Sequence, residues 1–256
     1  MTRIATWNVN SLKVRLPQVL EWCTGMQPDI IALQETKLQD ENFPAADIAA
    51  AGYQVVYAGQ KTYNGVAIMS RERATDVVTG IPGLEDTQRR MLAASYGDLR
   101  IINVYVPNGQ SVGSEKYHYK LDWLDKLTAY LTEQLQVYPR LILLGDFNIA
   151  PEDRDIYDAE AWREKILCST PERQVLQAIS QTGLYDTFRL TDQEESQFSW
   201  WDYRMNGFRR NLGLRIDLIL ASQAMVDEHT LTVIDKTPRG WERPSDHAPV
   251  VAQFNS

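Results

Sequence analysis

Apolar and polar positions along this chain follow two different periods. Short, nearly continuous apolar runs predict buried β-strands, and longer segments with an apolar residue at every third or fourth position predict amphipathic helices. Strands are predicted for residues 3–10, 28–33, 54–58, 65–70, 75–79, 90–96, 100–106, 141–148, 214–221, 226–235 and 250–254. Helices are predicted for residues 12–24, 45–51, 115–136 and 170–182, with a loop and helix over the acidic stretch 153–164.

Local signals set several of the helix boundaries. Ser11 is a suitable N-cap for the first helix, and Gly25 is suited to end it. Pro171 fits the first position of the helix that starts at Thr170. The acidic residues of segment 153–164 are expected to be solvated.

The order of the elements predicts mixed sheets. Residues 3–33 run strand, helix, strand, which is a βαβ unit with parallel strands. The short strands over residues 54–106 are separated by turn signals, which favours antiparallel pairing. An α/β fold follows, in which strands 226–235 and 250–254 are expected to complete the second sheet.

The two halves of the chain begin in a similar way. The segment from residue 1 and the segment from about residue 139 each run a buried strand into a pair of polar residues. We therefore expect one domain, residues 1–256, built from two similar halves of about 1–137 and 138–256.

Composition narrows the class of protein. The formal net charge of −8 argues against a protein that coats nucleic acid through bulk charge. No apolar run is long enough for a membrane span, and no secretory signal is recognised at residue 1. The two cysteines, Cys23 and Cys168, are too few for a disulfide framework and suit a reducing cytoplasm, where we expect the protein to be.

Polar side chains gather where the predicted strands end, and both halves contribute to them. In two facing sheets these ends would share one edge, as ligand sites in such sheets do. Each residue also has an ordinary interpretation, such as a solvated loop acid for Glu35 or a half-buried aromatic for Tyr105. The set comprises Asn8, Asn10, Glu35, Tyr105, Asn108, Asp146, Asn148, Asp217, Asp246 and His247.

Asp217 is unusual because it lies inside an apolar run. A buried carboxylate needs a hydrogen-bond donor, and His247 is a candidate. His247 follows Asp246 in a loop between Pro244 and Pro249, so the prolines should stiffen the turn that carries this pair.

Segment 198–211 interleaves aromatic residues with arginines. Aromatic rings stack on bases or sugars and arginines bind phosphates, so the segment could contact nucleic acid. It could equally be a hydrophobic flap whose arginines stack on its own aromatic rings.

The donor types exclude several chemistries. The chain has no Cys/His cluster of the kind that binds zinc, no glycine-rich phosphate loop with lysine as in nucleoside triphosphatases, and no nucleophile elbow as in serine hydrolases. Carboxylate and amide oxygens suit Mg²⁺, with Mn²⁺ as an alternative. Such a site suits phosphodiester hydrolysis, in which the protein positions the reactants and neutralises charge.

Six motifs in order give the chain a family resemblance. They are WNVN at 7–10, LQETK at 33–37, YVPN at 105–108, GDFN at 145–148, GLRID at 213–217 and SDHAP at 245–249. The chain resembles the exonuclease III family, the bacterial exodeoxyribonuclease III and abasic-site endonuclease group of the endonuclease/exonuclease/phosphatase superfamily. The resemblance implies a DNase I-like fold, a four-layered sandwich of two packed mixed β-sheets flanked by helices.

The resemblance also implies roles for individual residues. It makes Glu35 the principal metal ligand, with Asn10 and Asp246 near the metal. It makes Asp146 the residue that orients or deprotonates the attacking water. The remaining catalytic positions that it implies are His247 on the phosphate, Asp217 behind the His247 ring, and Asn8, Tyr105 and Asn148 around the phosphate and nucleophile. The DNA-binding positions that it implies are Asn108, Arg204, Arg209 and Arg210 on the backbone, and Trp200, Met205 and Leu214 around an extruded sugar or 3′-terminal nucleotide.

The implied activity is Mg²⁺-dependent hydrolysis of DNA that leaves a 3′-hydroxyl group. The substrate would be double-stranded DNA with 3′ ends or abasic sites, attacked by a monomer as a 3′→5′ exonuclease, a 3′-end-cleaning phosphatase or an abasic-site endonuclease in base excision repair. Two alternatives remain. One is a phosphatase of the same fold that acts on a non-DNA phosphoester, and the other is a DNA-binding member with weak catalysis.

Overall fold

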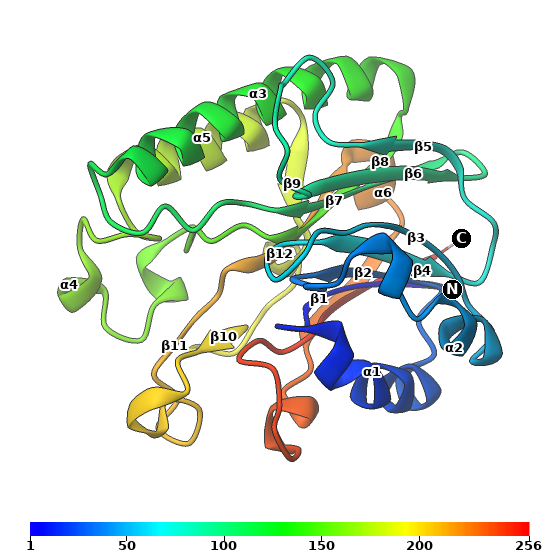
Figure 1. Cartoon of the computed structure of the whole chain (residues 1–256). Helices are drawn as coiled ribbons and strands as arrows, with labels where there is room; N and C mark the ends of the chain where they lie inside the picture. The colour runs from blue at the N-terminus through cyan, green and yellow to red at the C-terminus, as the bar shows by residue number, and fades with distance from the viewer. Residues whose placement is uncertain (256) are drawn as a thin grey trace.

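A computed structural model describes residues 1–255 as four stacked layers, in which two β-sheets pack face to face between two layers of helices (Figure 1). The first sheet has the order β13-β14-β1-β2-β4-β3, from β13 (His229–Ile234), β14 (Val250–Phe254), β1 (Thr2–Asn8), β2 (Ile30–Gln34), β4 (Val66–Ser70) and β3 (Gln54–Ala58). The second has the order β5-β6-β7-β8-β12-β9, from β5 (Thr75–Thr79), β6 (Met91–Tyr96), β7 (Leu99–Tyr105), β8 (Arg140–Asp146), β12 (Asp217–Ser222) and β9 (Leu184–Asp186). The sandwich and the mixed strand directions confirm the predicted fold class.

Helices cover the outer face of each sheet. Helices α1 (Leu12–Met26) and α2 (Ala45–Ala50) lie on the first sheet, and α3 (Glu115–Val137) and α5 (Thr170–Gln181) lie on the second (Figure 1). The short helices are α4 (Ala159–Trp162), α6 (Gln223–Val226), η1 (Asp40–Asn42), η2 (Asp153–Asp155), η3 (Thr187–Arg189), η4 (Arg204–Asn206) and η5 (Thr237–Gly240). Within residues 1–255, no helix has both the length and the apolar character needed to cross a bilayer.

Strand alternation separates the core into layers. In β1, Ala5 and Trp7 pack in the cluster under α1, whereas Ile4 packs in the cluster between the sheets. Because side chains two positions apart share a face, Thr6 and Asn8 also point between the sheets. The core between the sheets is apolar over most of its length and becomes polar at the end where β1 finishes.

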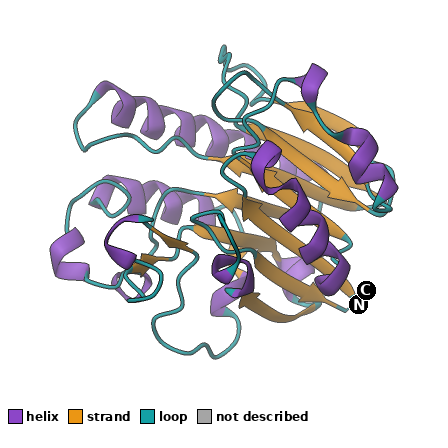
Figure 2. Ribbon diagram, turned by 60° about the horizontal axis from the view of Figure 1, so that its bottom comes forward, coloured by secondary structure: helices purple, strands orange, loops and turns teal. Residues whose placement is uncertain are grey.

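That polar end lies away from the chain termini. Figure 2 shows the two termini side by side at one end of the sheets, while the small hairpin of β10 (Trp200–Trp201) and β11 (Gly213–Leu214) lies beyond the other end. The parallel pairs β1–β2 and β7–β8 direct the carboxyl ends of all four strands toward this second end.

The expectation that the last two strands complete the second sheet is wrong. Strand β14 pairs antiparallel with β1, with Val250 opposite Thr6, and β13 lies beyond it in the first sheet. The loop just before β14 is also tied to β1, because Ser245 Oγ donates a 2.7 Å hydrogen bond to the Asn8 carbonyl oxygen. The first sheet therefore contains strands from both ends of the sequence, whereas all strands of the second lie between Thr75 and Ser222.

The run 214–221 is not one strand. Leu214 pairs with Trp200 in the hairpin, and β12 starts only at Asp217. The hydroxyl oxygen of Ser199 accepts hydrogen bonds of 3.0 Å from the backbone N–H groups of both Ile216 and Asp217, which bends the chain between the two pairings.

Three local predictions about helices need correction. Ser11 makes no side-chain cap, because its φ of 88° is not that of a capping residue, and α1 ends at Gln27 in the left-handed region rather than at Gly25. The acidic segment 153–164 is not fully solvated, since Asp155 is 1% exposed and pairs with Arg215. The predicted start of α5 is confirmed, with a capping box between Ser169 and Glu172.

Candidate active site

Side chains from both sheets converge at the polar end of the sandwich. The convergence follows from strand direction, because β1, β2, β7 and β8 all deliver their last residues there, while antiparallel β12 begins there. The central group consists of Asn8, Glu35, Tyr105, Asp146, Asp217 and His247.

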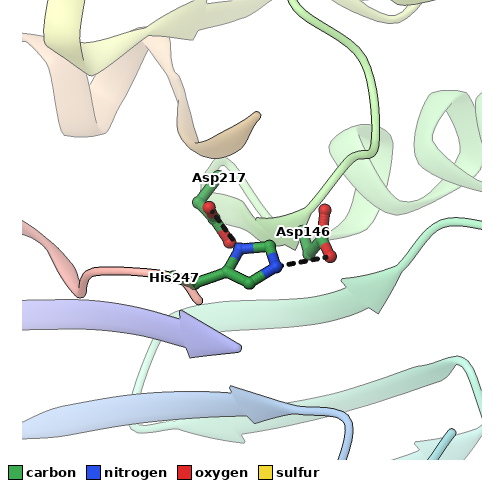
Figure 3. A group of neighbouring side chains, drawn as sticks. All are labelled: Asp146, Asp217 and His247. Atoms are coloured by element: carbon green, nitrogen blue, oxygen red, sulfur yellow. Dashed lines mark hydrogen bonds and ion pairs between the residues drawn. The ribbon is translucent and has the colours of Figure 1, made fainter. Parts of the chain in front are cut away.

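His247 lies between two carboxylates (Figure 3). Its Nδ1 is 2.8 Å from Oδ2 of Asp217, and its Nε2 is 3.8 Å from Oδ2 of Asp146. Burial opposes a charged ring, but the carboxylates of Asp217 and Asp146 outweigh it and raise the pKa of His247 to about 10. Burial also raises the pKa of Asp146, to about 7. The predicted Asp217–His247 hydrogen bond is confirmed, and Asp217 orients the ring.

Asn8 connects the two halves of this group. Its Nδ2 donates to Oε1 of Glu35 at 3.1 Å and to Oδ2 of Asp146 at 2.9 Å. Tyr105 adds a second link, because its hydroxyl donates to the same Glu35 oxygen at 2.8 Å. Burial and the Glu35 charge raise the pKa of Tyr105 well above its usual value, so the phenol stays protonated.

Lys37 connects Glu35 to Asn10 and, through Asn10, to Asp246. The Lys37 ammonium lies 2.8 Å from Oε2 of Glu35 and 2.5 Å from Oδ1 of Asn10. Asn10 Nδ2 in turn donates to Oδ1 of Asp246 at 2.9 Å. Burial raises the pKa of Glu35, but the Lys37 charge, the hydrogen bonds from Lys37 and Asn8 and the His247 charge together outweigh it. The net shift is downward, so the carboxylate is ionised.

This donor set fits a hard divalent cation. Glu35, Asn10 and Asp246 offer carboxylate and amide oxygens, and a positive charge, the Lys37 ammonium, already bridges two of them. A second group that could hold a metal ion is Asp146, Asp217 and His247. In that group Asp217 and the His247 ring are already bonded to each other, so the Glu35 group is the more available one.

Two amides flank the Asp146 side of the site. Asn108 Nδ2 donates to Oδ1 of Asn148 at 3.2 Å, and Asn148 Nδ2 donates to the Val106 carbonyl oxygen at 3.0 Å. Asn148 is 6% exposed, whereas Asn108 is exposed, so Asn108 is the more accessible to a ligand.

A close backbone contact places Asp146. Gly145 has φ +145°, and a Cβ there would lie 1.9 Å from the carbonyl oxygen of Val104 on the neighbouring strand. Only glycine allows β8 to approach β7 this closely, directly before the site aspartate. The GDFN motif therefore has a backbone requirement as well as a chemical one.

The aromatic–arginine segment borders the site. Trp200 Nε1 donates to Oδ2 of Asp246 at 3.0 Å, so this ring holds an acid of the site. Met205 is 74% exposed, and Arg204, Arg209 and Arg210 are exposed, whereas Leu214 is fully buried and can act on a ligand only from beneath the surface.

The flap alternative is partly right. Trp201 is buried, and a cation does stack on the aromatic rings, but it is Arg239 from η5, over Trp201, Tyr203 and Phe208. The arginines of the segment itself therefore stay at the surface.

A groove of about 890 Å³ continues from the site. Tyr105 and Asn108 form one part of its wall. The rest carries amides and two cations, with Gln60, Asn64, Gln88, Arg90 and Lys116 among the lining residues. The two cations of this mixed polar and aromatic groove suit an extended phosphate-bearing ligand, despite the negative net charge of the chain.

Sequence reasoning missed several supporting residues. Lys37 lies within the LQETK motif and was not assigned a role, although a lysine two positions from a site acid is a usable signal. Ser245 and Ser199 act through backbone groups, and Lys120 contacts the site from α3, so no local pattern marks them.

The chain is similar to known proteins over nearly its whole length. Residues 5–247 match the Endonuclease/Exonuclease/phosphatase family. The chain is 37% identical to exodeoxyribonuclease III of Haemophilus influenzae, over 98% of this chain and 99% of that protein. The 3′ phosphatase NExo from Neisseria, solved with a product DNA hairpin, has a TM-score of 0.98 and 48% identity, and an AP endonuclease from Archaeoglobus fulgidus has 0.96 and 37%; both alignments cover 100% of each chain.

Proposed function

The chain belongs to the endonuclease/exonuclease/phosphatase family, and from this membership we propose that it is a metal-dependent DNA-repair phosphodiesterase acting at the 3′ ends of double-stranded DNA. The observation that carries the proposal is the convergence of Asn8, Glu35 and Asp146 through one amide nitrogen, with His247 beside Asp146. This arrangement puts a candidate metal ligand, a candidate base and a candidate phosphate-binding cation within one site.

In the proposed reaction, the oxygen of a water molecule bonds to phosphorus and the bond between phosphorus and O3′ breaks. Asp146 takes the proton of the water, for which a carboxylate with a pKa of about 7 is well suited. A proton is returned to O3′, so the product carries a 3′-hydroxyl group. The same bond breaks in 3′ phosphatase, 3′→5′ exonuclease and abasic-site reactions, which explains how one site could serve all three.

The other site residues bind and orient in this proposal. The protonated His247 ring donates from Nε2 to a phosphate oxygen, while Asp217 fixes the ring. Asn8 orients Asp146, and Tyr105 orients Glu35. Asn148 and Asn108 donate to the phosphate backbone.

Mg²⁺ is the proposed metal, with Mn²⁺ as a substitute. Glu35 would be the principal ligand, with Asn10 and Asp246 close by, and Lys37 would leave its place between Glu35 and Asn10. A bound divalent cation would supply positive charge against the phosphate and the leaving oxygen. The three protein donors are all hard oxygens, which supports this choice.

DNA would lie across the groove and the exposed hairpin region. Arg204, Arg209 and Arg210 would contact phosphates, and Met205 would contact the duplex from its exposed position. Trp200 and the buried Leu214 would define the wall of the pocket for the terminal sugar. We further propose that the protein acts as a cytoplasmic monomer, in line with the two unpaired, buried cysteines.

We propose action at 3′ ends as the main activity because the chain is more similar to the 3′ phosphatase from Neisseria, at 48% identity, than to the archaeal AP endonuclease, at 37%. Incision at abasic sites is the second candidate, which the similarity to that AP endonuclease favours. It requires room for an extruded sugar beside Trp200.

The test uses two 5′-labelled duplexes, one with a 3′-terminal phosphate and one with an internal abasic analogue, each incubated with Mg²⁺ and then with EDTA. We expect Mg²⁺-dependent phosphate release and shortening from the 3′ end. A single cut on the 5′ side of the lesion, faster than 3′ processing, would instead make abasic-site incision the main activity. If neither duplex gives a Mg²⁺-dependent product, the proposal is refuted and only the family membership remains.

A further inference from the structure

A second polar layer lies one step deeper than the site, between the two sheets. Thr6 is two positions before Asn8 in β1, and Asn103 is two positions before Tyr105 in β7. Residues two apart in a strand share a face, so Thr6 and Asn103 point into the same space as the site residues that follow them. Both are 0% exposed, in a core between the sheets that is otherwise lined by apolar clusters.

Gln34 joins this layer from the position directly before Glu35. Its Nε2 donates to Oγ1 of Thr6 at 2.9 Å and to Oδ1 of Asn103 at 2.8 Å. Gln34 is also 0% exposed. Thr6 and Gln34 belong to the first sheet and Asn103 to the second, so the second of these bonds crosses between the sheets.

Asn103 makes two more bonds across the same boundary. Its Nδ2 donates to the backbone carbonyl oxygens of Leu33 at 3.0 Å and Ala67 at 2.9 Å. One side chain of the second sheet is thus tied to β2 and β4 of the first. Leu33 lies two positions before Glu35, so these bonds act close to the candidate metal ligand.

We propose that Thr6, Gln34 and Asn103 form a registration layer that fixes one sheet against the other and thereby positions Glu35 against Tyr105 and Asn8. The three are positioning residues, because they act through the residues that follow them in their strands. The inference rests on the proposed phosphodiester hydrolysis for its kinetic readout, but metal binding tests it separately.

The hydrogen bonds of this layer are directional, whereas the apolar contacts around it are not. Apolar contacts between two sheets are not directional, so they hold the sheets together without fixing a slide of a few tenths of an ångström. Hydrogen bonds lose strength steeply with misalignment, and a buried amide left unpaired is costly. Catalytic groups need placement within about 0.5 Å, and a misplacement of about 1 Å can cost ~10²-fold in rate.

Matched valine substitutions test the layer. Thr6→Val keeps the side-chain shape and removes the acceptor for Gln34. Thr232→Val is the control, since Thr232 is equally buried, lies in β13 of the same sheet and bonds the His229 ring. Gln34→Met, a stronger change of similar length, removes the hydrogen bonds of Gln34 to Thr6 and Asn103 together with its longer bond to the Ala32 carbonyl oxygen. If Gln34→Met does not fold, the comparison of the two valine variants still decides.

Two readouts are measured for each variant, namely kcat and KM for release of a 3′-terminal phosphate, and the rise in melting temperature on addition of MnCl₂. We expect kcat to fall about tenfold in Thr6→Val and ~10²-fold in Gln34→Met, with KM within about threefold of the wild-type value. The manganese-induced rise should shrink in both, because Glu35 is displaced. Thr232→Val should lower the melting temperature in the absence of metal but keep kcat and the manganese-induced rise.

A purely structural role for the layer predicts another pattern. If Thr6→Val and Thr232→Val lose similar thermal stability and both keep kcat and the manganese-induced rise, the inference is refuted. If the wild-type protein shows no metal-dependent hydrolysis at all, the proposed function fails. Metal binding would then still test the registration layer. A manganese-induced rise in melting temperature that is smaller in Thr6→Val than in the wild-type protein would support the layer, and an equal rise would refute it.

Discussion

His247 and Asp217, thirty residues apart in the chain, meet in a buried hydrogen bond of 2.8 Å between Nδ1 and Oδ2. The His247 side chain is 5% exposed and the Asp217 side chain 0%, so neither could ionise cheaply without the other. The pair accounts both for the acid inside the apolar run and for the orientation of Nε2 toward Asp146. Its protonation state couples the stability of the fold to the chemistry of the site.

The first prediction concerns pH and stability. Because the folded protein raises the pKa of His247 to about 10 from its usual 6.5, the folded state holds this proton more tightly than the unfolded state. That contribution is fully present below pH 6.5 and is lost as the pH rises toward 10. The free energy of unfolding in urea should therefore fall with pH across this window, by at most about 1.4 kcal/mol per pH unit from this group.

Replacement of the histidine checks the assignment. His247→Gln should remove this part of the pH dependence, whereas His118→Gln, at an exposed position of α3, should keep it. Equal slopes in His247→Gln and the wild-type protein would show that the ring is not charged in the folded state.

The second prediction concerns Asp146. Asp146→Asn keeps the shape of the side chain but cannot take a proton from water, so kcat for 3′-phosphate release should fall at least about 10²-fold. The variant should fold, because an amide at this position removes a carboxylate whose charged form is disfavoured by burial. Activity within tenfold of the wild-type rate in a folded variant would exclude Asp146 as the base.

The third prediction concerns the buried ion pair of Lys120 and Glu172. Both side chains are 0% exposed and lie 2.5 Å apart, and Lys120 also donates to the Asn148 carbonyl oxygen at 2.7 Å. Lys120→Met leaves an unpaired buried carboxylate and should cost ~3–5 kcal/mol of unfolding free energy. Urea unfolding measures this loss.

A double variant separates charge burial from packing. Lys120→Met combined with Glu172→Gln should recover part of the stability, because no buried charge is then left alone. If the double variant is as unstable as the sum of the single ones, the ion pair does not explain the loss.

The fourth prediction concerns DNA binding by the exposed arginines. Arg209→Ala combined with Arg210→Ala should weaken binding of a duplex and make it less dependent on salt, since each lost phosphate contact lowers the slope of log K against log salt by about one. Arg163→Ala, an exposed arginine outside this segment, is the control. An unchanged salt slope in the double variant would place the DNA elsewhere.

Much of the site was predictable because its signals are local. Each of Asn8, Glu35 and Asp146 follows an apolar run, and the period of a strand indicates which of its residues share a face. The burial of Asp217 was predictable in the same way, and so was its need for a donor. The motif order then linked these positions to one family.

Such local signals could not predict contacts between residues that are far apart in the sequence. Nothing near Asp155 shows that it is buried, because the cation that pairs with it, Arg215, lies sixty residues away. Whether an acid is solvated depends on such a partner, not on the polarity of its own segment.

The sequence alone determined most of the longer elements, the fold class and the set of polar strand ends, because hydrophobic periodicity and turn residues act over a few positions. The tertiary structure decided which strands share a sheet and which side chains touch. It placed β14 beside β1 instead of in the second sheet, and it brought Asn8 between Glu35 and Asp146. These outcomes depend on strand pairing and sheet packing between distant segments, whose geometry exists only once the chain has folded.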